Sequence, residues 1–153
     1  MRADDLGSPF VHRLDGDWRI KWVARPEQRI ADFHRTDFDD GSWGTIPVPA
    51  NWETHGHGTP IYVSAGYPFQ IDPPRVTSEP PQHYTTFTER NPVGAYRHEF
   101  EIPDAWSDRR VFSHFGGVQS AFYLWMNGER VGYSQGSMSP AEFEVTGHVR
   151  PGH

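Results

Sequence analysis

Glycine and proline interrupt this sequence so often that a long helix has no room to form. The 153 residues include 15 glycines and 14 prolines. Both residues destabilise helix interiors, and proline also removes a backbone donor. Between these interruptions, apolar and polar residues alternate over short stretches, as they do in half-buried strands. The sequence therefore predicts an all-β, antiparallel fold with short strands and long loops, in the β-sandwich or jelly-roll class.

The expected strands lie toward the two ends of the chain. Residues 53–94 are rich in turn-forming glycine and proline, and we expect them to form mostly loop. Two prolines confine the stretch Ile46–Trp52 to the edge of a sheet. The remaining expected strands are Leu14–Trp22, Tyr96–Ile102, Arg110–Phe115, the two arms that flank residues 127–128, and Glu142–Val145.

The dipeptide Asn127-Gly128 gives the sharpest local prediction. Asn-Gly favours a two-residue type I′ turn, in which both central residues have positive φ. That turn pairs Met126 with Glu129, Trp125 with Arg130, Leu124 with Val131 and Phe122 with Tyr133. The expected core face then carries Phe122, Leu124, Met126, Val131 and Tyr133. The opposite face carries Tyr123, Trp125, Arg130 and Ser134, and we expect Trp125 and Arg130 to meet a second packed surface there.

Composition excludes several classes of protein. The formal net charge is −6 and the chain has no cysteine, so we expect no nucleic-acid partner, disulfide, thiol nucleophile or zinc ribbon. No apolar run reaches the roughly 18 residues that a membrane span needs, so we expect no membrane partner. The first residues show no apolar core of a signal peptide, and we therefore expect a cytoplasmic protein.

The residues themselves indicate no catalytic site. Gly132-Tyr133-Ser134-Gln135-Gly136 matches the G-x-S-x-G nucleophile motif, but that motif needs a strand, a sharp turn and a helix, whereas here it lies in a hairpin arm. His55 and His57 form an H-x-H pair with no evident third metal ligand, so we expect a hydrogen-bonded loop and no metal. No pair of carboxylates stands out as the two that a glycosidase requires.

Larger stretches of the chain resemble the glycoside hydrolase family 2 β-galactosidases. The most specific runs from Gly117 through the Asn127-Gly128 turn to Ser137 and continues with Pro140-Ala141-Glu142-Phe143. Further matching stretches, in the family's order, are residues 14–18, 48–52, 60–62, 72–74 and 91–97. The resemblance covers nearly the whole chain from Leu14 onward.

That resemblance implies a galactose-binding-like β-sandwich at residues 14–153, preceded by an N-terminal arm at residues 1–13. In the family, a separate barrel carries two catalytic glutamates, and a barrel of about 250 residues does not fit in this chain. We therefore expect a C-terminally truncated sandwich without closing strands, from a parent that hydrolyses terminal β-D-galactosides with retention, and we expect the chain alone to be inactive. The alternative is a free-standing carbohydrate-binding module or interaction domain without an enzymatic partner.

The resemblance also implies where sugar and ions bind. Ser64 aligns with a family asparagine that touches galactose hydroxyls, which makes Ser64 the candidate substrate-binding residue. Gln135 aligns with a position near a structural cation in some relatives. We expect no catalytic residue, metal site or cofactor in this chain, although parent enzymes often use Mg and Na. The implied partners are a galactoside bound by the parent enzyme and the catalytic barrel of the same polypeptide, and we also expect self-association.

Overall fold

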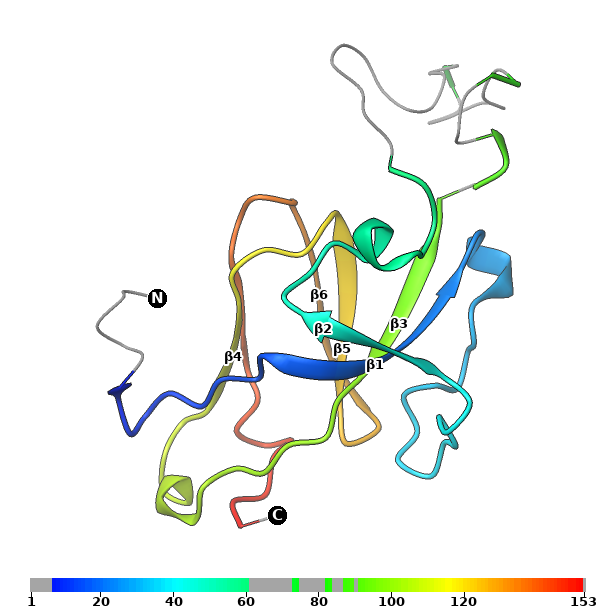
Figure 1. Cartoon of the computed structure of the whole chain (residues 1–153). Coiled ribbons are helices and arrows are strands. Elements are labelled where there is room, and N and C mark those ends of the chain that lie inside the picture. The colour runs from blue at the N-terminus through cyan, green and yellow to red at the C-terminus, as the bar shows by residue number, and fades with distance from the viewer. Residues whose placement is uncertain (1–6, 61–72, 75–81, 84–86, 90, 153) are drawn as a thin grey trace. The chain divides into compact units, whose positions relative to one another are not determined.

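The computed structural model of the chain is built from short antiparallel strands, which confirms the all-β prediction (Figure 1). The structure describes residues 7–60, 73–74, 82–83, 87–89 and 91–152. The strands in this part of the chain are β1 (Gly16–Val23), β2 (Gly44–Val48), β3 (Val93–Arg97), β4 (Phe112–Phe115), β5 (Ala121–Met126), β6 (Glu129–Gln135) and β7 (Ala141–Glu144). Short 3-10 helices are η2 (Pro26–Gln28), η3 (Trp52–His55) and η5 (Asp104–Trp106).

The chain divides into two compact units. The three-stranded unit consists of residues 15–31 and 40–98 and contains β1, β2 and β3. The hairpin unit consists of residues 1–14, 32–39 and 99–153 and contains β4 to β7. Each unit has its own small group of buried apolar residues.

In the three-stranded unit, β1 lies between the two other strands, in the order β2-β1-β3. Trp18, Ile20 and Trp22 alternate with more exposed residues along β1, as predicted from the period of two. Ile20 is 1% exposed, and Ile46 of β2, which is 0% exposed, completes the centre of this core. Pro47 lies in β2 at the edge of the sheet, where a strand tolerates a residue without an N–H group.

The predicted strand Tyr96–Ile102 is wrong beyond Arg97, because β3 spans Val93–Arg97 and residues 98–102 lie outside any strand. β3 ends at Arg97, whose Nε donates a hydrogen bond of 2.7 Å to Oδ2 of Asp40. Both side chains are largely shielded from solvent, so this ion pair is screened less than a surface pair. Beyond it, Ile102 and Phe100 pack in the core of the hairpin unit. Alternation alone cannot show that one periodic stretch contributes to two different cores.

In the hairpin unit, β4 pairs with β7 and β5 pairs with β6 (Figure 1). The buried centre consists of Ile102, Val111 and Val145. Half-buried side chains that pack against this centre are Phe100, Trp106, Met126, Val131, Phe143 and Val149.

The turn of the β5–β6 hairpin forms as predicted. Asn127 has φ 50° and Gly128 has φ 85°, and the pairs Met126–Glu129 and Trp125–Arg130 are present. The Asn127 amide also donates a 2.8 Å hydrogen bond to the carbonyl oxygen of His148.

The predicted register is wrong beyond the first two pairs. Leu124 pairs with Gly132, Tyr123 with Tyr133, and Phe122 with Ser134, so Val131 is an extra residue on β6. This β-bulge reverses the alternation that follows it. Tyr133, expected in the core, is 44% exposed and lies beside Tyr123. Leu124 is only half-buried, so its truncation should cost less than the loss of a fully buried side chain.

The signal for the bulge was the glycine inside β6. A Cβ on Gly132 would lie 2.5 Å from Cε1 of Phe143, so the ring of Phe143 occupies the space that a side chain would need. An isolated glycine in a strand often marks a bulge or a close approach, and here it marks both.

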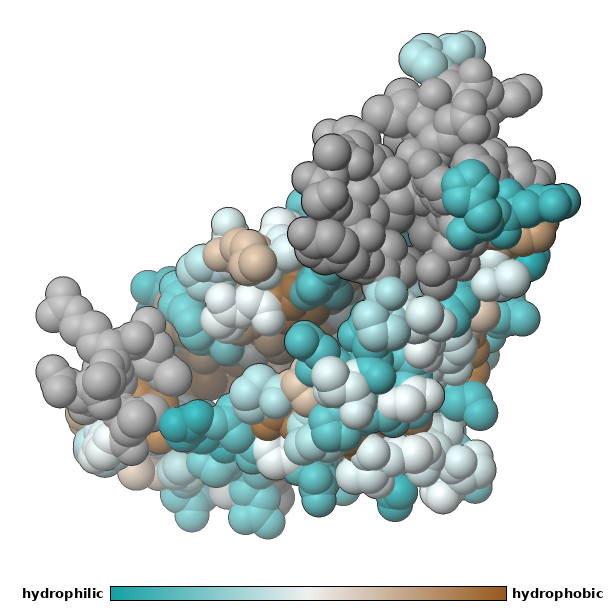
Figure 2. Space-filling model, turned by 45° about the horizontal axis from the view of Figure 1, so that its top comes forward, coloured by the Kyte–Doolittle hydropathy of each residue, from teal (hydrophilic) through white to brown (hydrophobic). Residues whose placement is uncertain are grey.

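Figure 2 shows hydrophilic residues over most of the face it presents, with apolar residues visible in small areas between them. No helix in the described part of the chain has the length and apolar character of a membrane span.

Candidate functional site

The candidate sugar contact, Ser64, lies outside the described residues. The structure does describe the two places where its segment joins the three-stranded unit. One is the stretch from η3 to Pro60, and the other is residues 87–89, which lead toward β3.

Thr59 and Glu89 meet at these two junctions. The backbone N–H of Thr59 donates to Oε2 of Glu89 at 3.0 Å, and the Thr59 hydroxyl donates to Oε1 at 2.9 Å. One carboxylate thus uses both oxygens to bind a single residue that is 30 positions away in the sequence. Hydrogen bonds to an ionised acceptor are stronger than those between neutral groups.

Tryptophan rings cover the backbone next to this contact. A Cβ on Gly58 would lie 3.0 Å from Cζ2 of Trp22, and one on Gly94 would lie 2.7 Å from Cζ3 of Trp52. Gly94 is the partner of Trp22 across β1 and β3. The buried Nε1–H of Trp22 has no hydrogen-bond partner among the described residues. The rings can pack this closely because both glycines lack a side chain.

Tyr96 of β3 shares this region. Burial, and to a smaller extent the charge of Glu53, raise the pKa of the Tyr96 phenol. The Tyr96 hydroxyl is therefore protonated at neutral pH, where an ordinary phenol is protonated as well.

The G-x-S-x-G match has the wrong setting for a nucleophile. Residues 132–135 all lie within β6, and the next residues form turns and then β7. An activated serine of this type sits on a sharp strand-to-helix turn. Ser134 faces the side of the hairpin that carries Phe122, its cross-strand partner.

The candidate metal ligands are not grouped in the part of the chain that the structure describes. No set of three or more His, Asp or Glu side chains there is placed to hold an ion. His55 ends η3, and His57 follows Gly56, which has a left-handed conformation. The side-chain oxygen of Gln135 accepts a 2.8 Å hydrogen bond from the hydroxyl of Tyr133.

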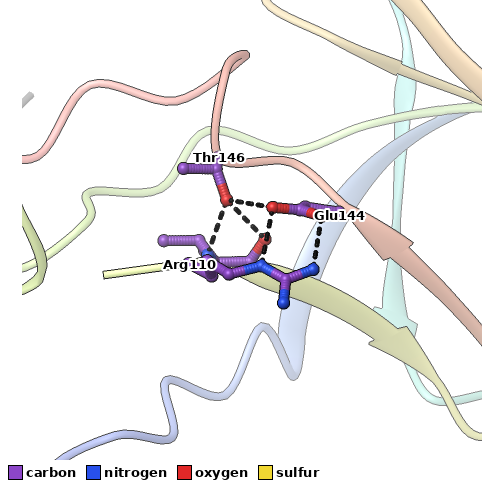
Figure 3. Close-up of polar contacts among 4 residues, drawn as sticks. Arg110, Glu144 and Thr146 are labelled. Atoms are coloured by element: carbon purple, nitrogen blue, oxygen red, sulfur yellow. Dashed lines mark hydrogen bonds and ion pairs between the residues drawn. The ribbon is translucent and has the colours of Figure 1, made fainter. Parts of the chain in front are cut away.

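The carboxyl groups with shifted pKa values are tied to arginines. Arg110 donates to both oxygens of Glu144, at 3.0 and 2.7 Å, and lowers the pKa of that carboxyl (Figure 3). Thr146 donates to Glu144 and accepts the backbone N–H of Val111, which joins β4 to β7 beyond their ladder. Arg35 lowers the pKa of Asp37 in the same way. Glycosidase general acids need a raised pKa, so neither carboxyl fits that role.

The hairpin unit also contains a hollow of about 510 Å³ beside residues 10–14. Trp106 donates from Nε1 to the carbonyl oxygen of Pro9 at 3.1 Å, and the Arg109 guanidinium lies 4.3 Å from the centre of the Phe10 ring. These contacts hold the residues before β1 against the unit. Apolar side chains on the wall of the hollow include Phe100, Ile102, Val111, Val145 and Val149.

The outer face of the hairpin is aromatic, as the sequence predicts. Arg130 and Trp125, however, contact different rings. The Arg130 guanidinium lies 4.9 Å from the centre of the Tyr123 ring. Trp125 stacks on His34 and meets Phe33 edge-on, with ring centres 5.6 and 5.3 Å apart. Phe33 and His34 of the same unit therefore provide a packed surface for Trp125.

The fold and the sequence together define the class of this domain. The chain belongs to the family described as glycosyl hydrolases family 2, sugar binding domain, whose model matches residues 11–153. This match confirms the family resemblance inferred from the residue patterns.

The relatives with the same sequence pattern are β-galactosidases. The chain is 42% identical to one from Psychromonas ingrahamii over 149 residues, which cover 97% of the chain and 13% of that protein. It is 43% identical to one from Vibrio vulnificus strain YJ016 over 141 residues, or 91% of the chain and 12% of that protein. The chain therefore spans only about an eighth of the length of these relatives.

Solved structures show the same fold. A glycosyl hydrolase family 2 member from Bacteroides cellulosilyticus superposes with a TM-score of 0.58 at 24% identity, over 92% of this chain and 16% of that one. A Bacteroides uniformis β-glucuronidase superposes with a TM-score of 0.59 at 16% identity, over 91% and 13% of the two chains. These similarities confirm the β-sandwich class.

Proposed function

We propose that this chain is the N-terminal, non-catalytic domain of a β-galactosidase that hydrolyses terminal β-D-galactosides with retention of configuration. The observation that carries the proposal is the 42% identity to a β-galactosidase over 97% of the chain. The chain spans 13% of that relative, which leaves ample length for a catalytic barrel in the same polypeptide.

Within such an enzyme, we assign residues 1–13 to an arm and residues 14–153 to a sandwich that supports the sugar site. Ser64 is the candidate contact to the sugar. The pKa values of Asp37 and Glu144 are lowered, which supports a scaffolding role over an acid–base role for those groups.

Activity measurements test whether catalysis requires the part of the enzyme outside residues 1–153. We expect the full-length enzyme to hydrolyse a chromogenic β-galactoside, and the purified chain of residues 1–153 to show no turnover above buffer. Turnover by the chain that persists after contaminating enzyme is removed would overturn the assignment. An inactive full-length protein would overturn the proposed substrate.

Substitutions at Ser64 test its role in the full-length enzyme. Replacing Ser64 with Ala removes one hydroxyl, and we expect KM for the galactoside to rise about 2- to 10-fold, as for the loss of one hydrogen bond. Ser64→Asn restores the amide found in the family and should leave KM at or below the wild-type value. Unchanged kinetics in Ser64→Ala would remove Ser64 from the site.

A free-standing carbohydrate-binding module is the second candidate, because the matching family is described as a sugar binding domain. Titration calorimetry of residues 1–153 with galactose and lactose separates the two. Saturable binding by the chain alone favours the module, and binding only in the full-length protein favours the enzyme domain. For the enzyme we further propose a cytoplasmic location, supported by the absence of cysteine, and Mg or Na sites in the parent outside this chain.

A further inference from the structure

We propose that Asn127 is a site of spontaneous deamidation in this domain, and that its conversion to a carboxylate loosens the segment 146–152 from the β5–β6 turn. The reaction uses only the chain itself and water. The inference concerns the hairpin unit alone and does not depend on the proposed function.

Of the three asparagines in the chain, only Asn127 is followed by a residue that favours deamidation. In the first step, the backbone nitrogen of the following residue attacks the side-chain carbonyl carbon. Asn51 is followed by tryptophan, whose bulk hinders the attack, and Asn91 is followed by proline, which has no N–H to lose. Gly128 has an N–H group and no side chain. The sequence therefore singles out Asn127 among residues of a thermolabile type.

The reaction balances without an oxidant or a reductant. The nitrogen of Gly128 loses its proton and bonds to Cγ of Asn127, and the side-chain nitrogen leaves as ammonia. Water then opens the resulting succinimide ring at either carbonyl carbon. One product has aspartate at position 127, and the other has isoaspartate, which lengthens the backbone of the turn by a methylene group. Each product carries a negative charge where the amide was neutral.

The turn leaves the reacting groups accessible. Asn127 is exposed, and its backbone has φ 50°. The last pair of the ladder is Met126–Glu129, so the N–H of Gly128 is not part of the ladder. The space beside Gly128 is open, since the nearest atoms to a Cβ there would be 3.8 Å away. Water can therefore reach the amide, and no ladder bond holds the attacking nitrogen.

One hydrogen bond restrains the Asn127 amide. Its Nδ2 donates to the carbonyl oxygen of His148 at 2.8 Å. His148 is itself held, because its Nδ1 lies 3.1 Å from Oε2 of Glu129, the first residue after the turn. Ring closure removes Nδ2 as ammonia, so the bond to His148 has to be given up. The folded segment therefore slows a reaction that the sequence favours.

The products cannot remake this bond. A carboxylate only accepts hydrogen bonds, and the carbonyl oxygen of His148 only accepts them as well. Glu129 already places one carboxylate against His148, and deamidation adds a second. The segment 146–152 also carries Val149, which packs against the buried centre of the hairpin unit. We therefore expect deamidation to loosen the packing of this segment.

Mass spectrometry of the chain of residues 1–153, held in warm and mildly alkaline buffer, locates the reaction. We expect aspartate and isoaspartate to accumulate at Asn127 ahead of the other two asparagines. Hydroxylamine, which cleaves the succinimide, should cut the chain between Asn127 and Gly128. In chain unfolded by urea, where the bond to His148 is absent, the reaction at Asn127 should run at least about twofold faster, the smallest effect expected for one lost hydrogen bond.

His148→Ala tests the restraint in the folded chain. The variant keeps the backbone carbonyl but loses the contact with Glu129, so we expect deamidation at Asn127 to run about 2- to 10-fold faster. His114→Ala is the matched control, because His114 makes the same kind of contact with Glu142, at 2.9 Å. The two imidazoles are similarly shielded, with 27% and 30% of their side chains exposed. The control should react at the wild-type rate.

Asn127→Asp reproduces the charge change without ageing. Aspartate visits the left-handed backbone conformation as asparagine does, so this variant isolates the lost amide donor. Hydrogen exchange reports on the segment 146–152, where the N–H of Gly152 donates to the carbonyl oxygen of Ile102 at 2.8 Å. We expect the amides of this segment to exchange about 2- to 10-fold faster than in wild type. The amides of β1, in the three-stranded unit, should exchange at the wild-type rate.

Three results overturn the proposal. Equal rates at Asn127, Asn51 and Asn91 in the folded chain would remove the site. A rate at Asn127 that neither urea nor His148→Ala changes would remove the restraint. Unchanged exchange of the segment 146–152 in Asn127→Asp would remove the consequence. None of these measurements uses a galactoside, so their outcome is independent of the proposed function.

Discussion

Single residues decide how closely the strands and rings of this domain approach one another. Gly132 leaves room for the ring of Phe143, and Gly94 does the same for Trp52. At the hairpin turn, Asn127 and Gly128 adopt the positive φ angles that most side chains disfavour. These positions are where a small substitution should have a large effect.

Adding one methyl group at Gly132 tests the close approach of β6 and Phe143. Because the new Cβ would lie 2.5 Å from Phe143 Cε1, we expect Gly132→Ala to lower the free energy of unfolding by about 1–3 kcal/mol. Gly147→Ala is the control, since nothing lies within 4 Å of its Cβ position. Urea unfolding measures both, and equal midpoints would contradict the packing described.

Two substitutions at Asn127 separate its backbone role from its side-chain role. Asn127→Ala loses both the hydrogen bond to His148 and a residue that tolerates φ 50°, and we expect a cost of about 1–2 kcal/mol. Asn127→Gly keeps the favourable turn and loses only the hydrogen bond, so it should cost less. If both variants unfold at the same urea concentration, the strain at this position is negligible.

At the scale of elements, pairs of strands are supported by polar contacts outside the ladder. Contacts beyond the ladder extend the pairing of β4 and β7 by one step (Figure 3). On one side lie Arg110 and Val111, just before β4. On the other side lie Glu144, the last residue of β7, and Thr146, two residues later. Such an exposed ion pair is sensitive to pH and salt.

The Arg110–Glu144 pair predicts part of the loss of folding stability at low pH. The arginine lowers the pKa of Glu144 in the folded chain below the value of the unfolded chain, which is about 4.3. The ion pair therefore stabilises the fold above about pH 4.3. This stabilisation is lost as the pH falls through the lower pKa of the folded chain. We expect Glu144→Gln to be less stable than wild type at pH 7 and to lose less stability between pH 5 and pH 2.5. Arg110→Ala should behave alike. If the melting temperatures of the variants and of wild type fall equally between pH 5 and pH 2.5, this prediction is contradicted.

At the scale of the whole molecule, the open edges of the sheets matter most. In the described residues, β4, β5, β6 and β7 are each paired on one side, and β2 and β3 form the edges of the larger sheet. Unpaired backbone groups at an edge can pair with another chain. Large apolar side chains such as Phe112, Tyr123 and Met138 are also exposed.

We therefore predict that residues 1–153 self-associate. Light scattering over a concentration series should give a mass above the 17.5 kDa of one chain, rising with concentration. The physical cause is strand pairing at the free edges together with burial of exposed apolar surface. A monodisperse 17.5 kDa species at high concentration, with one cooperative melting transition, would show that the edges are closed within one chain.

Local chemistry determined much of this fold from the sequence alone. Alternation located β1, proline placed β2 at an edge, and Asn127-Gly128 determined the turn and its first two pairs, because these features depend on residues that are neighbours in the chain. The signature around the same hairpin was also sufficient to identify the family.

Only the tertiary structure decided the rest. The bulge at Val131 lies beside the close approach of Phe143 to Gly132, Arg97 at the end of β3 bonds Asp40, and Glu89 bonds Thr59 across 30 residues. In each case the partner is distant in the sequence, so a local pattern carries no record of it. Long-range packing and hydrogen bonding therefore determine the register of β6 and the arrangement at the ends of the segment that carries Ser64.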